Sequence, residues 1–280
     1  MKLINLLNAG SSFLQQNNIS SYQLDTELLL SKVMKKRREE LLVSLNTLVN
    51  YEKIKKFSYF IKRRSNKEPV AYILNEKEFW SKNFYVNQNT LVPRPETELM
   101  VEKLVKIFKN RRINLLDIGT GSGCIIISLL TELKTSKGVG LDISKKALDI
   151  AKINSKRHKL FRKIKFLNLS FSKLYHQKFD LVVSNPPYIK SSDLKNLDCD
   201  VKNFEPKIAL DGGNDGLDLI KKVIYKTRVL LKKRGIFALE IGHGQYEKVS
   251  KILKSTKFRI EYIVKDYNDN IRCIISRNID

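Results

Sequence analysis

The sequence predicts an α/β fold in which a mostly parallel, seven-stranded sheet follows a helical N-terminal region. Two observations lead to this fold class. After about residue 97, apolar runs of strand length alternate with longer segments of helical periodicity, which is typical of a parallel sheet covered by helices on both faces. Before residue 67, apolar residues recur only at helical spacing. Hydrophobic residues make up 42% of the 280-residue chain, which suffices for a buried core and excludes a wholly disordered protein.

Residues 1–66 are expected to form a small helical bundle. Leu24, Leu28 and Leu29 recur at helical spacing, and a second periodic stretch covers residues 54–61. No strand pattern occurs in this region, so we expect it to be a separate N-terminal domain.

A change of pattern at Pro69 marks the end of the bundle. The apolar run Val70–Leu74 and the run Phe79–Val86 are separated by the polar break at residues 75–77, which predicts a β-hairpin. We therefore expect a hairpin linker over residues 67–90, followed by a second domain over residues 91–280.

The second domain is expected to contain alternating helices and strands. The predicted helices cover residues 97–109, 123–133, 145–157, 216–231 and 244–254. The predicted strands cover residues 113–118, 137–142, 163–168, 179–184, 235–241, 258–264 and 271–276. The polar turn at residues 266–270 joins the last two strands as a hairpin, so one of them should be antiparallel.

The chain is strongly basic, with 53 Lys and Arg against 29 Asp and Glu, a net charge of +24. Such an excess suits a nucleic-acid binder. However, the lysines are spread along the chain among many Asn and Ile residues, as a biased genome composition would also produce, and the densest runs lie at predicted helix ends. We therefore expect no specific nucleic-acid partner.

The spacing of the cysteines and the lengths of the apolar runs indicate in which cellular compartment the protein is expected. Cys124, Cys199 and Cys273 are widely spaced and form no CxxC pair, which predicts neither a disulfide framework nor a metal site and fits a reducing cytoplasm. No apolar run approaches the ~20 residues needed to cross a bilayer, so no membrane association is expected. We also expect the protein to be a monomer.

A glycine-rich turn, Gly119-Thr120-Gly121-Ser122-Gly123, connects a buried strand to a helix. Glycine allows turns with positive φ and lets a ligand approach the backbone. The spacing is GxGxG rather than the GxGxxG of dinucleotide sites, and the next strand ends in Asp142, whose carboxylate could accept both hydroxyls of a ribose. A glycine turn alone would indicate only a tight connection, but together with Asp142 it favours a nucleoside cofactor.

A second motif, Asn185-Pro186-Pro187-Tyr188, directly follows the buried strand 179–184. In open α/β sheets ligands lie beyond the carboxyl ends of the strands, so this segment should lie beside the cofactor. The Asn185 amide oxygen and the Pro186 carbonyl could both accept from one planar NH2 group, and the Tyr188 ring could pack on its face. Such a clamp would orient the nitrogen lone pair toward an electrophilic carbon, whereas the structural alternative is a simple Asn-Pro turn.

The order of these motifs resembles class I S-adenosylmethionine-dependent methyltransferases that act on amino groups. The further segments match one family within this class in order, the bacterial peptide chain release factor glutamine N5-methyltransferases. These segments are Glu68–Ile73 (EPVAYI), Pro93–Glu98 (PRPETE), Phe204–Pro206 (FEP) and Ala209–Leu217 (ALDGGNDGL). The resemblance covers nearly the whole chain.

The resemblance implies a Rossmann-like methyltransferase sheet and an S-adenosyl-L-methionine site on Gly119, Thr120, Gly121, Ser122, Gly123, Asp142, Phe171 and Asn185. It places the substrate amide on Asn185, Pro186, Pro187 and Tyr188, with Asn185, Pro186 and Tyr188 in the catalytic clamp. It also implies that residues 1–66 recognise the substrate and that residues 91–280 form the catalytic domain. Phe171 stands where the family usually has a larger aromatic residue, and Ser170 replaces its usual acidic neighbour.

The expected reaction is methylation of the side-chain amide nitrogen of the glutamine in the GGQ loop of class 1 release factors. One alternative is a nucleic-acid enzyme that methylates adenine N6 or guanine N2 of a flipped base. The charge of +24 favours that alternative, whereas the PRPETE segment and the lack of a target-recognition module oppose it. A binding module without catalysis is disfavoured because the clamp and the glycines are intact.

Overall fold

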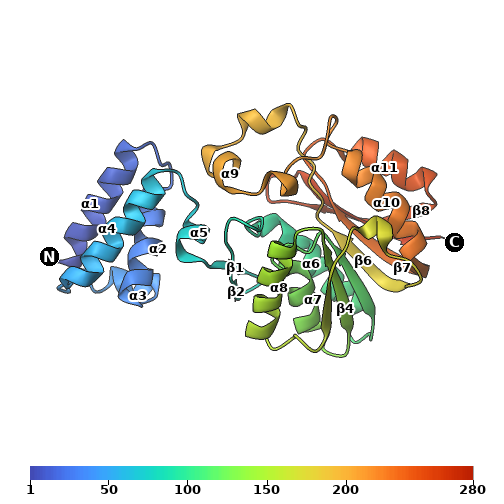
Figure 1. Ribbon diagram of the computed structural model, residues 1–280, viewed down its shortest axis with the longest axis horizontal. Coiled ribbons are helices and arrows are strands. Elements are labelled where there is room, and N and C mark those ends of the chain that lie inside the picture. The colour runs from blue at the N-terminus through green and yellow to red at the C-terminus, as the bar shows by residue number, and fades with distance from the viewer. Residues whose placement is uncertain (280) are drawn as a thin grey trace. The chain divides into compact units, whose positions relative to one another are not determined.

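A computed structural model describes residues 1–279, which divide into two compact units (Figure 1). Unit 1 contains Met1–Glu76 together with the later segment Asp198–Phe204. Unit 2 contains Lys77–Leu197 and the described chain from Glu205 onward. The inclusion of residues 198–204 in unit 1 has no counterpart in the sequence pattern. None of the helices formed by these 279 residues combines the length and the apolarity that a bilayer crossing requires.

Unit 1 is helical, as the periodicity predicts. Its helices are α1 (Leu3–Gln16), α2 (Tyr22–Met34), α3 (Arg38–Leu42), α4 (Tyr51–Ser65), α5 (Val70–Leu74) and α9 (Cys199–Phe204). Helices α1, α2 and α4 pack against one another around leucines such as Leu29 and Leu30, which are fully buried (Figure 1). Asn50 begins α4 by accepting a hydrogen bond from the Lys53 N–H, which satisfies one of the free donors at the helix start.

The predicted strand at Val70–Leu74 is wrong, because this segment is the short helix α5. Pro69 precedes the helix with φ of −57°, a value that suits helix entry, and Asn75 ends it in the left-handed conformation. Tyr72 and Ile73 are buried on this turn. The predicted second strand, Phe79–Val86, is also wrong, because the turn of the observed hairpin, Trp80-Ser81, lies inside it. The hairpin is shorter and lies later in the chain than predicted. It consists of β1 (Lys77–Phe79) and β2 (Lys82–Phe84), joined through two residues with positive φ as a tight hairpin turn requires.

A buried ion pair anchors the discontinuous segment within unit 1. Arg64 on α4 donates from Nε to Asp25 Oδ2 at 2.6 Å and from Nη1 to Asp200 Oδ2 at 2.7 Å. Nη1 also donates to the Glu68 carbonyl, and the Ser21 hydroxyl donates to Asp25. The side chains of Arg64 and Asp25 are only 7% and 9% exposed, so their charges depend on each other for stabilisation.

Unit 2 contains the seven-stranded sheet, and its predicted topology is confirmed. The strands are β3 (Asn114–Ile118), β4 (Lys137–Asp142), β5 (Ile164–Asn168), β6 (Phe179–Ser184), β7 (Leu231–Glu240), β8 (Phe258–Lys265) and β9 (Ile271–Asn278). Their order is β5-β4-β3-β6-β7-β9-β8, and β9 alone runs antiparallel to both of its neighbours. The apolar runs of the central strands β3 and β6 are buried, because α-helices cover the sheet (Figure 1).

The helices of unit 2 follow the predicted alternation. They are α6 (Pro95–Phe108), α7 (Cys124–Glu132), α8 (Lys145–Arg157), α10 (Asp218–Leu230) and α11 (Tyr246–Ser255), with short 3-10 turns η1 (Phe171–Lys173), η2 (Asp193–Asn196) and η3 (Lys207–Ala209). The chain runs outward from β3 to β5 and then returns to β6 on the other side of β3. The carboxyl ends of β3 and β6 thus lie at the point where the strand order reverses, which is where open α/β sheets bind ligands.

We predict that Arg64→Leu destabilises unit 1. Removing the guanidinium leaves Asp25 buried and unpaired, which should lower the free energy of unfolding by about 3–5 kcal/mol. Denaturant unfolding followed by circular dichroism measures the change. Lys106→Ala is the control, because Lys106 and Glu102 form an ion pair whose side chains are 67% and 47% exposed, and its loss should cost less than about 1 kcal/mol. Equal unfolding midpoints for Arg64→Leu and wild type would contradict the prediction.

Candidate functional site

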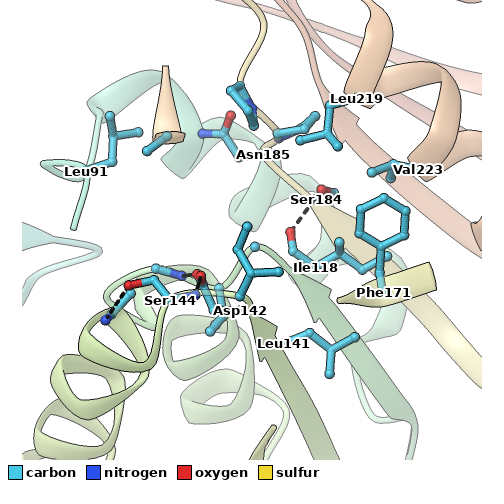
Figure 2. A pocket seen from close by; sticks show the side chains of 18 of the residues that line it. Leu91, Ile118, Leu141, Asp142, Ser144, Phe171, Ser184, Asn185, Leu219 and Val223 are labelled. Carbon is cyan, nitrogen blue, oxygen red and sulfur yellow. Dashed lines mark hydrogen bonds between the residues drawn. The ribbon is translucent and has the colours of Figure 1, made fainter. Parts of the chain in front are cut away.

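A cavity of about 860 Å³ lies at the carboxyl ends of β3, β4, β5 and β6 in unit 2 (Figure 2). Its wall includes residues 118–122, 141–144, 169–172 and 184–187, one segment from the end of each of these strands. Residues of the Pro93–Thr97 segment and of α10 complete it. The structure therefore brings most of the predicted site residues to one cavity, although they come from distant parts of the chain.

The glycines of the glycine-rich turn have two different roles, one at the cavity wall and one in helix packing. Gly119, with φ of +75°, borders the cavity, and a Cβ built there would have no neighbour within 4 Å. Gly123 is not part of the cavity wall. A Cβ on Gly123 would lie 3.0 Å from Ile127 Cδ1 and 3.3 Å from Ala151 Cβ, so this glycine instead allows α7 and α8 to pack closely.

Asp142 presents its carboxylate at the cavity wall in a fixed orientation. Oδ2 accepts from the Gly121 N–H at 2.9 Å and Oδ1 accepts from the Ser144 N–H at 2.8 Å (Figure 2). Burial raises the pKa of Asp142, and the two backbone donors oppose that rise. Each oxygen keeps lone-pair capacity, so the group can accept two further hydrogen bonds from a ligand with neighbouring hydroxyls.

Two apolar side chains border the same part of the cavity. Ile143, directly after Asp142, is 57% exposed, and Phe171 begins the 3-10 turn η1. Figure 2 shows the Phe171 ring at the wall, next to Val223 of α10. Such surfaces suit an aromatic ring, and only Phe171 among these side chains could be singled out from the sequence.

Asp117, the acidic residue before the glycine turn, supports the site from behind. It is fully buried, and its Oδ2 accepts from the Thr120 hydroxyl at 2.7 Å. Burial raises the pKa of Asp117 to about 7, and the negative charge of Asp142 adds to the rise. Asp117 thus holds Thr120 in the turn without bordering the cavity.

Asn185 and Pro186 lie at the cavity wall directly after β6. The last residue of β6, Ser184, donates its hydroxyl to the Ile118 carbonyl at 2.9 Å, so the ends of β6 and β3 are joined (Figure 2). The Asn185 Nδ2 lies 3.5 Å from Thr97 Oγ1, whose hydroxyl donates to Glu240 Oε2 at 2.7 Å. Pro187 also borders the cavity.

Tyr188 does not line this cavity in the structure. Its ring packs against the buried apolar cluster of the sheet, and its carbonyl accepts from Gln245 Nε2 at 2.9 Å. A Cβ on Gly242 would approach Tyr188 Cδ2 to 3.0 Å, so the glycine makes room for the ring. Burial raises the pKa of Tyr188 to about 12, so the phenol stays neutral near pH 7 and supports the loop by packing.

The pairing of the PRPETE and FEP segments is invisible in the sequence. Glu205, whose side chain is 2% exposed, accepts from Arg94 Nη2 at 2.7 Å and from the Val92 N–H at 3.3 Å. This carboxylate holds the 92–94 loop, of which Pro93 and Arg94 border the cavity. Both segments can be recognised as motifs in the sequence. Only the folded structure shows that Glu205 of the FEP segment anchors the loop that leads into the PRPETE segment.

Comparisons with known proteins match both parts of the chain. A family model described as the PrmC N-terminal domain matches residues 5–74, and a methyltransferase domain model matches residues 109–268. The release factor glutamine methyltransferase of Fusobacterium nucleatum is 37% identical over 98% of this chain and 78% of its own length. That of Buchnera aphidicola is 36% identical over 99% of both chains.

Other relatives are longer or more distant. The bifunctional methyltransferase of Rickettsia typhi is 35% identical over 96% of this chain, and the chain spans only 56% of that protein's length. Among solved structures, a methyltransferase from Pyrococcus furiosus is 16% identical with a TM-score of 0.53 over 70% of this chain and 88% of its own. Ribosomal protein L11 methylase from Lactobacillus delbrueckii is 19% identical with a TM-score of 0.50 over 66% and 80%. These two likenesses show the fold of unit 2.

We predict that Asp117→Asn stabilises the protein at alkaline but not at acidic pH. The raised pKa means that the folded state favours the protonated carboxyl, so wild-type stability is lost as the pH rises from the ordinary value of 3.8 through about 7. The amide removes that loss and keeps an acceptor for Thr120. We expect a gain on the order of 2–4 kcal/mol near pH 8 that largely vanishes near pH 4. Denaturant unfolding at both pH values measures it, and a pH-independent difference would refute the assignment.

Proposed function

The chain belongs to the release factor glutamine methyltransferase family, and we propose that it methylates class 1 peptide chain release factors. The methyl group of S-adenosyl-L-methionine is transferred to the side-chain amide nitrogen, N5, of the glutamine in the GGQ loop. The observation that carries this proposal is the placement of Asn185 and Pro186 on the same cavity as Asp142 and the glycine turn. It supports the proposal because a substrate amide held by Asn185 and Pro186 would lie beside a nucleoside held by Asp142 and the glycine turn.

The cavity fits S-adenosyl-L-methionine. The Asp142 carboxylate would accept the ribose hydroxyls, and the open space at Gly119 lets the ligand approach the backbone. Ile143 and Phe171 supply apolar surface for the adenine. When bound, this cofactor supplies a methyl group on a positively charged sulfur that is a good leaving group.

The protein's contribution is to hold the accepting nitrogen. The Asn185 amide oxygen and the Pro186 carbonyl would each accept a hydrogen bond from one N–H of the glutamine amide. These two hydrogen bonds would fix the position of the amide nitrogen. Holding both protons in this way opposes delocalisation of the nitrogen lone pair into the substrate carbonyl and keeps it available for attack. Among the described residues of the cavity wall, Asp142 is the only carboxylate, and it serves the ribose. We therefore assign no general base, because the nitrogen loses its proton readily once methylated.

The helical unit favours a macromolecular substrate. Residues 5–74 match a model described as the PrmC N-terminal domain, and a small free amide would need no second unit for recognition. We infer that residues 1–66 recognise the release factor and that residues 91–280 carry the reaction. The same clamp could accept an adenine or guanine amino group, so nucleic acids are the competing substrates in the test.

We predict that the purified protein adds one methyl group to the GGQ glutamine of a full-length class 1 release factor, as mass spectrometry would detect. Asn185→Ala should lower the single-turnover rate at least about 100-fold, because a preorganised polar contact to the reacting group is lost. Its unfolding transition should stay near wild type, and its cofactor affinity should fall much less than its rate. Methylation of RNA or DNA instead of the release factor would overturn the proposal.

We predict that Asp142→Asn weakens binding of S-adenosyl-L-methionine by about 1.5–3 kcal/mol, the range for hydrogen bonds to charged groups. Isothermal calorimetry measures the affinity. Asp149→Asn is the matched control, since that carboxylate is 54% exposed on α8 and pairs only with Lys152 in the described chain. Wild-type affinity should also fall as the pH drops through the raised pKa of Asp142, whereas the Asn variant should show no such fall. Unchanged affinity in the Asn variant would remove Asp142 from the site.

A further inference from the structure

Two buried side chains that can accept hydrogen bonds, Thr97 and Glu240, lie beside the Asn185 amide. We call them the acceptor pair. Ser184 and Leu239 form the last pair between β6 and β7. Asn185 follows β6 directly, and Glu240, the last residue of β7, still pairs with Cys273 of β9. Glu240 is 3% exposed, and Thr97, in the first turn of α6, is also 3% exposed. The Thr97 hydroxyl gives its single proton to Glu240 Oε2 at 2.7 Å, and its oxygen lies 3.5 Å from Asn185 Nδ2.

This pair discriminates between the two ends of the Asn185 amide. Because the Thr97 hydroxyl donates its proton to Glu240, the Thr97 oxygen can only accept a hydrogen bond from Asn185. The Glu240 carboxylate can also only accept. Two acceptors attract the NH2 end of an amide and repel its oxygen. We infer that the Asn185 Oδ1 is thereby turned away from the pair and is left free to accept from a ligand in the cavity that Asn185 lines (Figure 2).

The alternative orientation would be unproductive. If the amide were rotated by half a turn, Oδ1 would face Thr97 Oγ1 and Glu240, leaving buried acceptors opposed to each other. The NH2 group would then face the substrate amide nitrogen, donor against donor. Burial raises the pKa of Glu240 to about 7, and hydrogen bonds from Thr97 and Asn185 oppose that rise. Above this pKa Glu240 is ionised and can only accept.

We propose that Thr97 and Glu240 are positioning residues that fix the Asn185 amide with its oxygen toward the substrate nitrogen. This inference rests on the proposed function for its substrate, although the orientation of Asn185 itself does not. Thr97 and Glu240 act through Asn185 and do not hold the reacting atoms.

Thr97→Val tests the proposal because it removes the hydroxyl and keeps the shape of the side chain. We expect the rate of the chemical step to fall at least about tenfold, while KM for the release factor and cofactor affinity stay within about twofold. Thr97→Ser restores the hydroxyl and should recover most of the rate. Thr227→Val is the matched control: Thr227 is a buried threonine of α10 whose hydroxyl has no hydrogen-bond partner among the described residues, and its rate should equal that of wild type.

A double-mutant cycle separates positioning from direct action. If Thr97 acts through Asn185, then Thr97→Val should change the rate of the Asn185→Ala variant by less than about twofold, because the group that it positions is absent. A persistent tenfold loss in the Asn185→Ala background would overturn the proposal, since Thr97 would then act on the substrate or on the fold directly.

A measurement without substrate distinguishes this inference from the proposed function. In protein labelled with 15N in asparagine side chains, the Asn185 NH2 resonances are identified by their loss in Asn185→Ala. Thr97→Val should shift them and speed their exchange with water, and Thr97→Ser should not. Unchanged resonances in Thr97→Val would overturn the inference whatever the substrate is. Shifted resonances in a protein whose wild type leaves release factors unmethylated would support the inference and overturn only the proposed function.

Discussion

The parallel pairing of β3 with β6 is the constraint on which the site depends. Ile118 pairs with Ser184 in this register, so the glycine turn and the NPPY loop both begin one residue beyond the same rung of the sheet. The hydrogen bond from the Ser184 hydroxyl to the Ile118 carbonyl holds the two strand ends together. A shift of one strand by one residue would move each of its side chains to the opposite buried face of the sheet, so the packing of both apolar runs also fixes the geometry of the cavity.

The site joins two surfaces of different chemistry along one sheet edge. On the side of β4, Asp142 is charged and bound by backbone donors, which suits hydroxyl groups. On the side of β6 and β7, Asn185 is neutral and backed by acceptors, which suits N–H groups. Behind both surfaces lie the buried acids Asp117 and Glu240, whose pKa values burial raises to about 7. Burial of these two carboxyl groups lowers the stability of the folded protein near neutral pH. Each of them also accepts the hydrogen bond that holds a polar residue of the site in place.

The parts of this arrangement that could be predicted from the sequence are those whose signals are local. The glycine turn and NPPY each follow a buried strand directly, so their place at the sheet edge follows from the general rule for α/β folds. The role of Glu240 could not be predicted, because its partner Thr97 lies 143 positions away in the sequence, on a helix that packs against β7 only in the folded chain. The error at Val70–Leu74 has another cause: five apolar residues suit a strand or a buried helical turn equally, and here Pro69 and the core of unit 1 decide.

The discontinuity of unit 1 has a consequence for how the chain can be divided. The backbone passes between the units after Glu76, again after Leu197 and once more after Phe204, so neither unit is a continuous piece of sequence. A fragment beginning at Lys77 would carry Asp200 without Arg64, and a fragment ending at Glu76 would bury Arg64 with only one of its two carboxylates. Cutting the chain after Glu76, or exchanging residues 1–76 with those of a relative, would therefore separate Arg64 from the Asp200 with which it pairs.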